Sequence, residues 1–335
     1  MKVARFDTAR GGWEKPVTAA RGANWFINWA DFPALAAQGN RLTAVWFVNS
    51  PGGDDHAYHA QVGVSADAGK SWSAPAPLTR ESQTVEFVAL QPLPDGRLLA
   101  AWLDGRGRTG HHGKQALYAR TIGTNERDVL VDESVCDCCQ LSLAASGDAV
   151  WLAYRGRTAD EVRDMRVAAF RAGKWTAPQT LHTDGWKIAA CPVNGPQLAA
   201  SPQGVAAAWF TAASGEARVF AGRTAPGGTS IPNPQRIDLG RPQGRVDTVL
   251  LPDGRAVVTW LESTVGDKLG GIYARTLSPN GELSAPILLA ATTTARASGF
   301  PRIALLPGGS PSRVLLSYTR DGEPRQVATA LITLR

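Results

Sequence analysis

The sequence contains no apolar run approaching the ~18 residues that a membrane-spanning helix needs. Its first residues, MKVARFDTARGGW, lack the apolar core of a secretory signal peptide. Lysine is scarce, with 7 of the 35 basic residues, and the arginines form no run or stripe. The net charge of +6 therefore does not indicate a nucleic-acid partner, which requires clustered positive charge. We expect neither a nucleic-acid nor a membrane partner.

These absences leave two cellular locations open. The chain is either cytosolic or the mature form of an exported protein whose signal peptide has been removed. We favour export to a periplasm or out of the cell, and we expect a monomer.

One short pattern is repeated six times along the chain. Its copies are RLTAVWF (41–47), RLLAAWL (97–103), AVWLAYR (149–155), GVAAAWF (204–210), RAVVTWL (255–261) and SRVLLSY (312–318). Their aromatic anchors are Trp46, Trp102, Tyr154, Trp209, Trp260 and Tyr318, separated by 56, 52, 55, 51 and 58 residues. A period near 50 is typical of four-stranded propeller blades. The sequence therefore predicts one all-β domain over 1–335, a six-bladed β-propeller of four-stranded antiparallel blades.

The same order of segments recurs in each predicted blade. An apolar segment and a turn, often with glycine, precede the anchor strand, and a polar loop and a third strand follow it. The last blade lacks an outer strand because the chain stops after RQVATALITLR. We expect the segment before Trp25 to supply that strand and to close the ring, which would remove an exposed edge.

A turn motif in the first blade carries a family resemblance. SADAGKSW (65–72) fits the pattern S-x-D-x-G-x-x-W, and GKW (173–175) and GGW (11–13) look like degraded copies. The chain therefore resembles the sialidase-like superfamily of six-bladed propellers with BNR or Asp-box repeats. The loops containing CDCC and CPVNGP are similar to a pair found in a subfamily without a well-defined activity. The resemblance implies the fold, and it implies an anionic glycan gripped by arginines in a central funnel.

The unusual chemistry of the chain falls in loops that a propeller places on one face, the face of the funnel. All four cysteines lie there: Cys136, Cys138, Cys139 and Cys191. Cys136 and Cys191 each lie 18 residues before an anchor, so neighbouring blades hold them at equivalent places. Three interpretations stay open: disulfides of an exported protein, a thiolate site for Cu or Zn, and free or reactive thiols. His56, His111, His112 and His182 are further candidate ligands on this face.

The same loops and strand ends supply candidates for ligand binding. The candidate cations are Arg106, Arg155, Arg163, Arg245, Arg302 and Arg320. Guanidinium groups pair with ligand carboxylates through two parallel hydrogen bonds, although pairing with nearby acids of the chain is the alternative. Trp25, Trp186 and Asn194 complete the predicted binding set, since an exposed indole offers a platform for a sugar ring. The candidate acid and base for glycoside hydrolysis are Asp104, Glu86, Asp247 and Glu262.

Two sequence features of the standard sialidase mechanism are not evident in this chain. The family's F/Y-R-I-P motif is absent, and FPRI (300–303) has another order. Its tyrosine nucleophile is not evident either, because Tyr58, Tyr118 and Tyr273 occupy a third-strand position and the other two tyrosines are anchors. Three hypotheses remain. They are a sialidase-like propeller that binds or hydrolyses an anionic glycan or small molecule, a metal-thiolate or redox module built on the cysteines, and an interaction scaffold.

Overall fold

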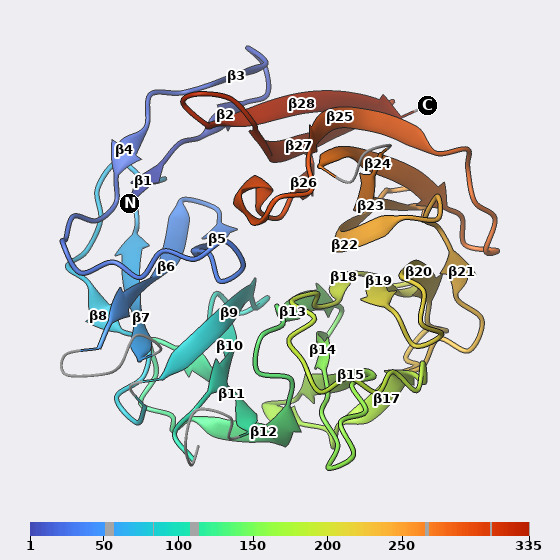
Figure 1. The fold of residues 1–335 in the computed structure, drawn as a ribbon. Coiled ribbons are helices and arrows are strands. Elements are labelled where there is room, and N and C mark those ends of the chain that lie inside the picture. Colours follow the sequence, from blue (N-terminus) through green and yellow to red (C-terminus); the bar gives the residue numbers. More distant parts are fainter. Residues whose placement is uncertain (51–56, 83, 108–113, 265–267, 309, 335) are drawn as a thin grey trace. The chain divides into compact units, whose positions relative to one another are not determined.

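The computed structural model describes residues 1–50, 57–82, 84–107, 114–264, 268–308 and 310–334. It is a nearly all-β chain in which six antiparallel sheets follow one another, each built from strands that are consecutive in sequence (Figure 1). This is the predicted six-bladed β-propeller. The chain forms two compact units, residues 1–133 and 134–335, which are described separately.

Unit 1 contains the N-terminal strands and the first two blades. The N-terminal strands are β1 (Lys2–Val3), β2 (Phe6–Asp7), β3 (Gly12–Trp13) and β4 (Val17–Thr18). The first blade is β5 (Ala34–Gln38), β6 (Arg41–Asn49), β7 (Tyr58–Ser65) and β8 (Ala76–Pro77). The second is β9 (Val85–Pro92), β10 (Leu98–Asp104), β11 (Gln115–Ile122) and β12 (Val129–Val135), whose last residues reach into unit 2.

Unit 2 contains the other four blades. The third is β13 (Ser142–Ser146), β14 (Ala149–Arg155), β15 (Met165–Arg171), β16 (Lys174–Trp175) and β17 (Gln179–His182). The fourth is β18 (Gln197–Ser201), β19 (Gly204–Thr211), β20 (Arg218–Arg223) and β21 (Gln235–Arg236). The fifth is β22 (Pro242–Leu250), β23 (Ala256–Ser263), β24 (Leu269–Leu277) and β25 (Ile287–Thr293). The sixth is β26 (Arg302–Leu305), β27 (Ser312–Arg320) and β28 (Gln326–Leu334), preceded by the 3₁₀ turn η1 (Arg296–Ser298).

The repeated anchors lie where the period predicted them, in the second strand of each sheet. Trp102, Trp209 and Trp260 are fully buried. Each packs into an apolar cluster shared with a neighbouring blade. Trp260, for example, lies against alanines of β19 in a cluster that joins the fourth and fifth blades. The small side chains leave room for the indole, so burial of the anchors joins one sheet to the next.

The structure bears on only part of what the sequence predicted for the two ends of the chain. The sixth blade has three strands, as expected from a missing outer strand. In unit 1, β1 pairs with β4 and β2 pairs with β3. The closure of the last blade by the N-terminal segment stays a prediction. Among the described residues, no helix is long and apolar enough to span a bilayer.

Candidate functional site

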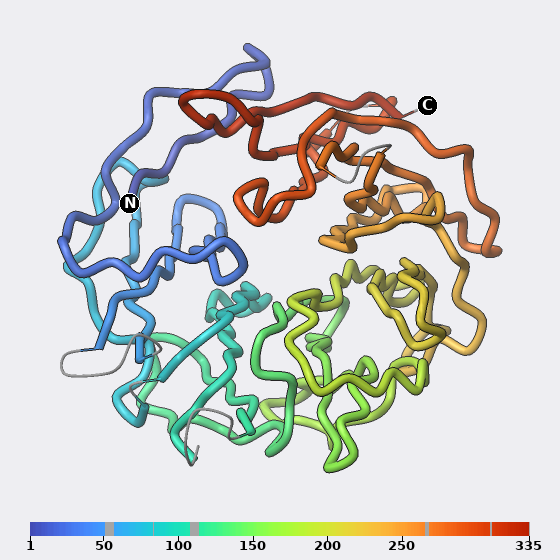
Figure 2. The backbone as a smooth tube through the Cα atoms, viewed as in Figure 1, coloured from blue at the N-terminus to red at the C-terminus, as the bar shows by residue number. Residues whose placement is uncertain are grey.

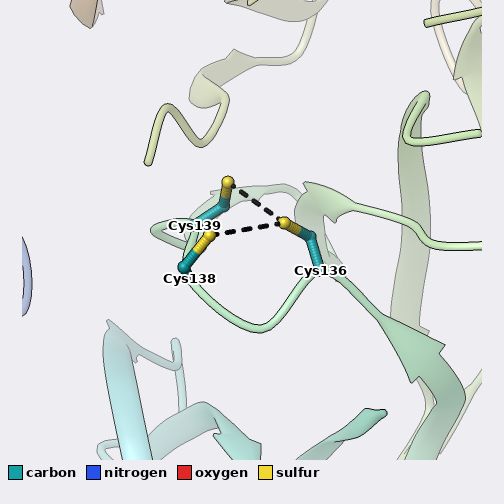
Figure 3. A group of neighbouring side chains, drawn as sticks. All are labelled: Cys136, Cys138 and Cys139. Atoms are coloured by element: carbon teal, nitrogen blue, oxygen red, sulfur yellow. Dashed lines mark hydrogen bonds between the residues drawn. The ribbon is translucent and has the colours of Figure 1, made fainter. Parts of the chain in front are cut away.

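The two cysteine loops come together in unit 2. Cys136 directly follows β12, Cys138 and Cys139 lie in the loop that leads to β13, and Cys191 lies in the connection from β17 to β18. Figure 2 traces the backbone of these connecting segments. The Cys136 sulfur lies 3.4 Å from that of Cys139 and 3.8 Å from that of Cys138. Figure 3 shows the three thiol groups directed toward one another. Cys191 Sγ lies within 4.8 Å of Cys138 Sγ and an oxygen of Asp137.

Burial divides the four cysteines, all of which are free thiols in the structure. Cys136 and Cys139 are each 1% exposed, whereas Cys138 is half-buried and Cys191 is exposed. Hydrogen bonds with Cys138 and Cys139, and the nearby guanidinium groups, hold the pKa of Cys136 well below its usual range. The hydrogen bond with Cys136 raises the pKa of Cys138, and burial raises that of Cys139. The hydrogen bond with Cys138 also lowers the pKa of Cys191, so the arrangement favours the thiolate form at Cys136 and Cys191 over Cys138 and Cys139.

Two of the predicted binding arginines lie near Cys136. Arg163 Nη1 donates to Cys136 Sγ at 3.2 Å, and Arg163 Nη2 donates to Glu161 at 2.8 Å. Arg155 is 1% exposed, and its guanidinium donates to carbonyl oxygens of Arg163, Asn194 and Phe210 at 2.7–2.8 Å. Among the described residues, no carboxylate forms a salt bridge with Arg155. Arg163 therefore contacts the sulfur cluster directly, and the Arg155 guanidinium is held by backbone carbonyl oxygens.

Two of the four candidate catalytic carboxylates are bonded to anchor indoles. Trp102 Nε1 donates to Asp104 at 2.8 Å, and Trp260 Nε1 donates to Glu262 at 2.6 Å. Asp104 and Glu262 are 1% and 3% exposed. Because residues i and i+2 of a strand share a face, each acid lies beside the indole two residues before it. These contacts support a structural role for both acids.

Asp247 and Asn194 join consecutive blades. Asp247 Oδ2 accepts a hydrogen bond from the Ile303 amide at 2.8 Å, and Asn194 Oδ1 accepts one from the Arg245 amide at 2.7 Å. Arg245 lies where the pairing of β22 shifts register, with a φ of 51°. Such a bulge turns a backbone amide away from its own sheet, and the side chain from the preceding blade satisfies it.

The remaining arginines also have partners within their own units. Arg106, in unit 1, pairs with Asp104 at 2.7 Å and with Asp128 at 2.6 Å, and its guanidinium lies over the ring of Tyr118. Arg106 therefore pairs with acids of the chain, which was the alternative to ligand binding.

In unit 2, Arg245 donates to the carbonyl oxygens of Thr294, Ala295 and Gly299, and burial lowers its pKa to about 10. Arg302 and Arg320 are the exposed members of the predicted set. Arg302 Nε lies 3.2 Å from Asp247 with 47% of its side chain exposed, and Arg320 bonds Gln326.

The two predicted aromatic platforms differ in access. Trp186 is 6% exposed and is covered by the Arg155 guanidinium, whose centre lies 4.7 Å from its ring. Trp25 is half-buried and tilts against Trp46, with ring centroids 5.9 Å apart. It lines a pocket of about 420 Å³ in unit 1, formed by Met1, Trp25, Phe26, Ile27, Asn28, Asp31, Pro33, Trp46 and Phe47.

Sequence reasoning missed the acid in this pocket. Asp31 is buried, its Oδ2 accepts a hydrogen bond from the Tyr58 hydroxyl at 2.7 Å, and its oxygens accept one from the Phe87 amide. Burial raises the pKa of Asp31 well above its usual range, and the charge of the predicted catalytic residue Glu86 adds to the rise. Asp31 lies 56 residues before its partner Phe87, one blade period, as Asp247 does before Ile303. The same one-period spacing thus relates each acid to the backbone amide that it accepts from.

One of the four candidate histidine ligands lies within the described residues. His182 Nδ1 lies 2.9 Å from the carbonyl oxygen of Ile231, and its Nε2 lies 3.8 Å from Asp184. His56, His111 and His112 lie outside the described residues. Their predicted part in a metal site stays a prediction.

Comparisons with known proteins give structural likeness alone. No family model and no curated protein sequence matches the chain. A Dyadobacter fermentans protein of unknown function has a TM-score of 0.55 at 16% identity, with 91% of this chain and 94% of that chain covered. A Fusarium graminearum GH93 α-L-arabinofuranosidase in complex with arabinobiose has a TM-score of 0.57 at 14% identity, with 93% and 95% covered.

A third similar structure is the leech intramolecular trans-sialidase complexed with 2,7-anhydro-Neu5Ac. It has a TM-score of 0.58 at 10% identity, and 94% of this chain and 70% of that chain are covered. Identities this low establish a shared fold and leave the chemistry to the residues of each chain. They support the predicted propeller over almost the whole length.

Proposed function

We propose that this chain is a carbohydrate-binding propeller and that the Trp25 pocket in unit 1 holds a sugar ring. The observation that carries the proposal is the pairing, in one pocket, of aromatic side chains with the buried acid Asp31. An indole offers an apolar surface to the C–H face of a sugar, while a few polar groups fix its orientation. The similar arabinofuranosidase and trans-sialidase structures, both with bound saccharides, add support at the level of the fold.

Hydrolysis is the finer part of the proposal. A glycosidase needs a carboxylic acid that stays protonated near neutral pH, and a second carboxylate close to it. Burial raises the pKa of Asp31, which favours the protonated form that this role requires. Glu86 is close enough for its charge to raise that pKa further, and the Tyr58 hydroxyl hydrogen-bonds Asp31. We assign the acid role to Asp31 and the second carboxylate to Glu86.

A separate candidate contact for an anionic ligand lies within unit 2, apart from the Trp25 pocket. Arg302 and Arg320 are the predicted binding arginines whose side chains reach solvent. A carboxylate-bearing sugar would displace the contact of Arg302 with Asp247 and gain a charge-assisted hydrogen bond. Neutral and anionic saccharides must therefore be tested side by side.

The decisive measurement is calorimetric titration with arabino-oligosaccharides, sialyllactose and oligouronates. Trp25→Ala is expected to weaken binding of the preferred saccharide by about 10-fold or more, because stacking is lost. The matched control is Trp13→Ala, since Trp13 is 48% exposed on β3 and lies outside the pocket. Equal affinities of the two variants, or no heat from any saccharide at millimolar concentration, would reject the proposal.

Hydrolysis has its own test with fluorogenic aryl glycosides. Asp31→Asn is expected to abolish release of the aryl group while retaining saccharide binding, because an amide cannot act as the acid. The amide oxygen can still accept the Phe87 N–H, and the thermal unfolding midpoint checks that the fold is intact. Binding without any turnover by the unaltered chain would restrict the proposal to a lectin. Partners that bind without any saccharide would favour the interaction scaffold.

A further inference from the structure

We propose that Cys136, Cys138 and Cys139 form a thiolate site for a soft d¹⁰ metal ion, Cu(I) or Zn(II), with Cys191 placed as a fourth ligand. The site lies in unit 2 and is independent of the proposed sugar pocket. Soft sulfur ligands select ions of this class. The four cysteines of the two loops would then act together as ligands of one ion.

The sulfur positions already match those around a bound ion. Thiolates at about 2.3 Å from an ion lie roughly 3.8–4.0 Å from one another in tetrahedral or trigonal geometry. The Cys136 sulfur lies 3.8 Å from that of Cys138 and 3.4 Å from that of Cys139, and all three lie within 4.8 Å of one another. A metal ion would enter with small adjustments of these side chains (Figure 3).

The surrounding charge fits a metal-thiolate centre. Three thiolates with Cu(I), or four with Zn(II), carry a net charge of about −2, and burying such a charge requires compensation. Arg163 and Arg155 are 3% and 1% exposed, and the first donates to Cys136 Sγ at 3.2 Å. Among the described residues, Arg155 has carbonyl oxygens rather than a carboxylate as its partners. Arg163 also pairs with Glu161 at 2.8 Å and with Asp137 at 3.4 Å, so its charge is shared with these acids. Arg155 supplies the larger part of the balancing positive charge, and the hydrogen bond from Arg163 to Cys136 Sγ adds to it.

The backbone holds the ligands in place before any ion binds. The Cys136 amide donates to the carbonyl oxygen of Arg155 at 2.9 Å. The loop of Cys191 is held to the other loop by the Gly195 amide, which donates to Gln140 Oε1 at 3.1 Å. Ligands fixed by such outer contacts lose little freedom when they bind.

Cys191 distinguishes the two ions. Cu(I) is stable with three thiolates, whereas structural zinc takes four ligands. Cys191 is exposed and is close to Cys138 and Asp137 rather than to the buried pair. We expect Cu(I) to use the three-sulfur set and Zn(II) to require Cys191.

The test uses the full chain, reduced and stripped of metal under anaerobic conditions. Cu(I) is titrated against a chromophoric Cu(I) chelator, and Zn(II) separately against a zinc chelator. One equivalent is expected to bind, and X-ray absorption should show sulfur ligands at about 2.2–2.3 Å. Cys136→Ser and Cys139→Ser are each expected to weaken binding of both ions by more than about 100-fold.

Further variants separate the ligands from their surroundings. Cys191→Ser should leave Cu(I) affinity within about threefold and weaken Zn(II) by more than about 100-fold. Arg163→Gln should weaken binding by about 10- to 100-fold, as loss of an outer hydrogen bond to a ligand does. The matched control is Arg236→Gln, which removes an ion pair with Asp238 elsewhere in unit 2.

Metal binding by the unaltered chain tests the proposal even if a cysteine variant fails to fold. Binding of neither ion by the reduced chain, or an absorption spectrum with only nitrogen and oxygen ligands, would overturn it. So would thiol titration that finds all four sulfurs oxidised in the purified, unreduced protein, which would favour disulfides. Failure here leaves the sugar pocket untouched, because no cysteine lines that pocket.

Discussion

The amide of Gly195 donates to the side-chain oxygen of Gln140 at 3.1 Å, and the two backbones are in direct contact. A Cβ atom on residue 195 would lie 2.0 Å from the Gln140 carbonyl oxygen. Gln140 ends the loop of Cys136, Cys138 and Cys139, and Gly195 belongs to the loop of Cys191. The absence of a side chain at this glycine therefore sets how closely the two cysteine loops approach.

Gly195→Ala is expected to lower the free energy of unfolding by about 3 kcal/mol or more, because backbone must move to admit the methyl group. Cys191 would move away from Cys138, and zinc affinity would fall with it. Denaturant unfolding and zinc titration measure the two effects. The matched control is Gly12→Ala, where a Cβ meets nothing within 4 Å. A Gly195→Ala variant as stable as that control would contradict the assignment.

The acids bonded to anchor indoles lead to a second prediction. Asp104→Asn removes the charge that Arg106 and the Trp102 indole both contact, so the buried Arg106 guanidinium loses a partner. Loss of one member of a buried ion pair costs about 3–5 kcal/mol. Because 19% of the Arg106 side chain is exposed and Asp128 remains as its partner, we expect a loss of about 2–3 kcal/mol. Denaturant unfolding measures it.

The control for Asp104→Asn is Asp95→Asn. Asp95 pairs with Arg97 on the surface, with 50% of its side chain exposed, so solvent screens the pair and its loss should change stability little. A catalytic role for Asp104 would give the reverse result, a loss of activity with stability unchanged.

Much of the fold was predictable because the anchors are periodic. A propeller blade buries an aromatic residue against its neighbour, so the repeat of Trp46, Trp102, Trp209 and Trp260 records the packing directly. The approach of the two cysteine loops also followed from this count, which places Cys136 and Cys191 at equivalent positions of neighbouring blades. Within those loops it is Cys138 that groups with Cys191.

The chemical surroundings of the candidate residues were only partly predictable. The spacing Trp102–Asp104 recurs at Trp260–Glu262, and alternation along a strand is enough to place each acid beside its indole. The contact of Asp31 with the Phe87 amide depends instead on a register shift in β9 and on a φ of 52° at a phenylalanine. Neither glycine nor any turn residue marks that bulge, so the sequence carries no local signal for it.

The last prediction concerns pH. Burial raises the pKa of Asp247, although Arg302 and the amides of Ile303 and Thr248 oppose the rise. A carboxyl whose folded-state pKa exceeds its unfolded value contributes stability that is present below about pH 4 and is lost as pH rises through the folded-state pKa. The contribution of Asp247 to the free energy of unfolding should therefore decrease from pH 4 toward neutrality.

The measurement is the difference in unfolding free energy between the unaltered chain and Asp247→Asn, taken at several pH values from 4 to 7. As pH rises, the unaltered chain is expected to lose stability relative to Asp247→Asn, because Asp247 ionises and asparagine does not. Asp95→Asn supplies a control of opposite sign, since hydrogen bonds from Arg97 lower the pKa of Asp95. Its contribution should be present at neutral pH and lost as pH falls. If Asp247 followed the same sign as Asp95, its hydrogen bonds and Arg302 would outweigh burial, and this buried carboxylate would stabilise the joint between blades in its charged form.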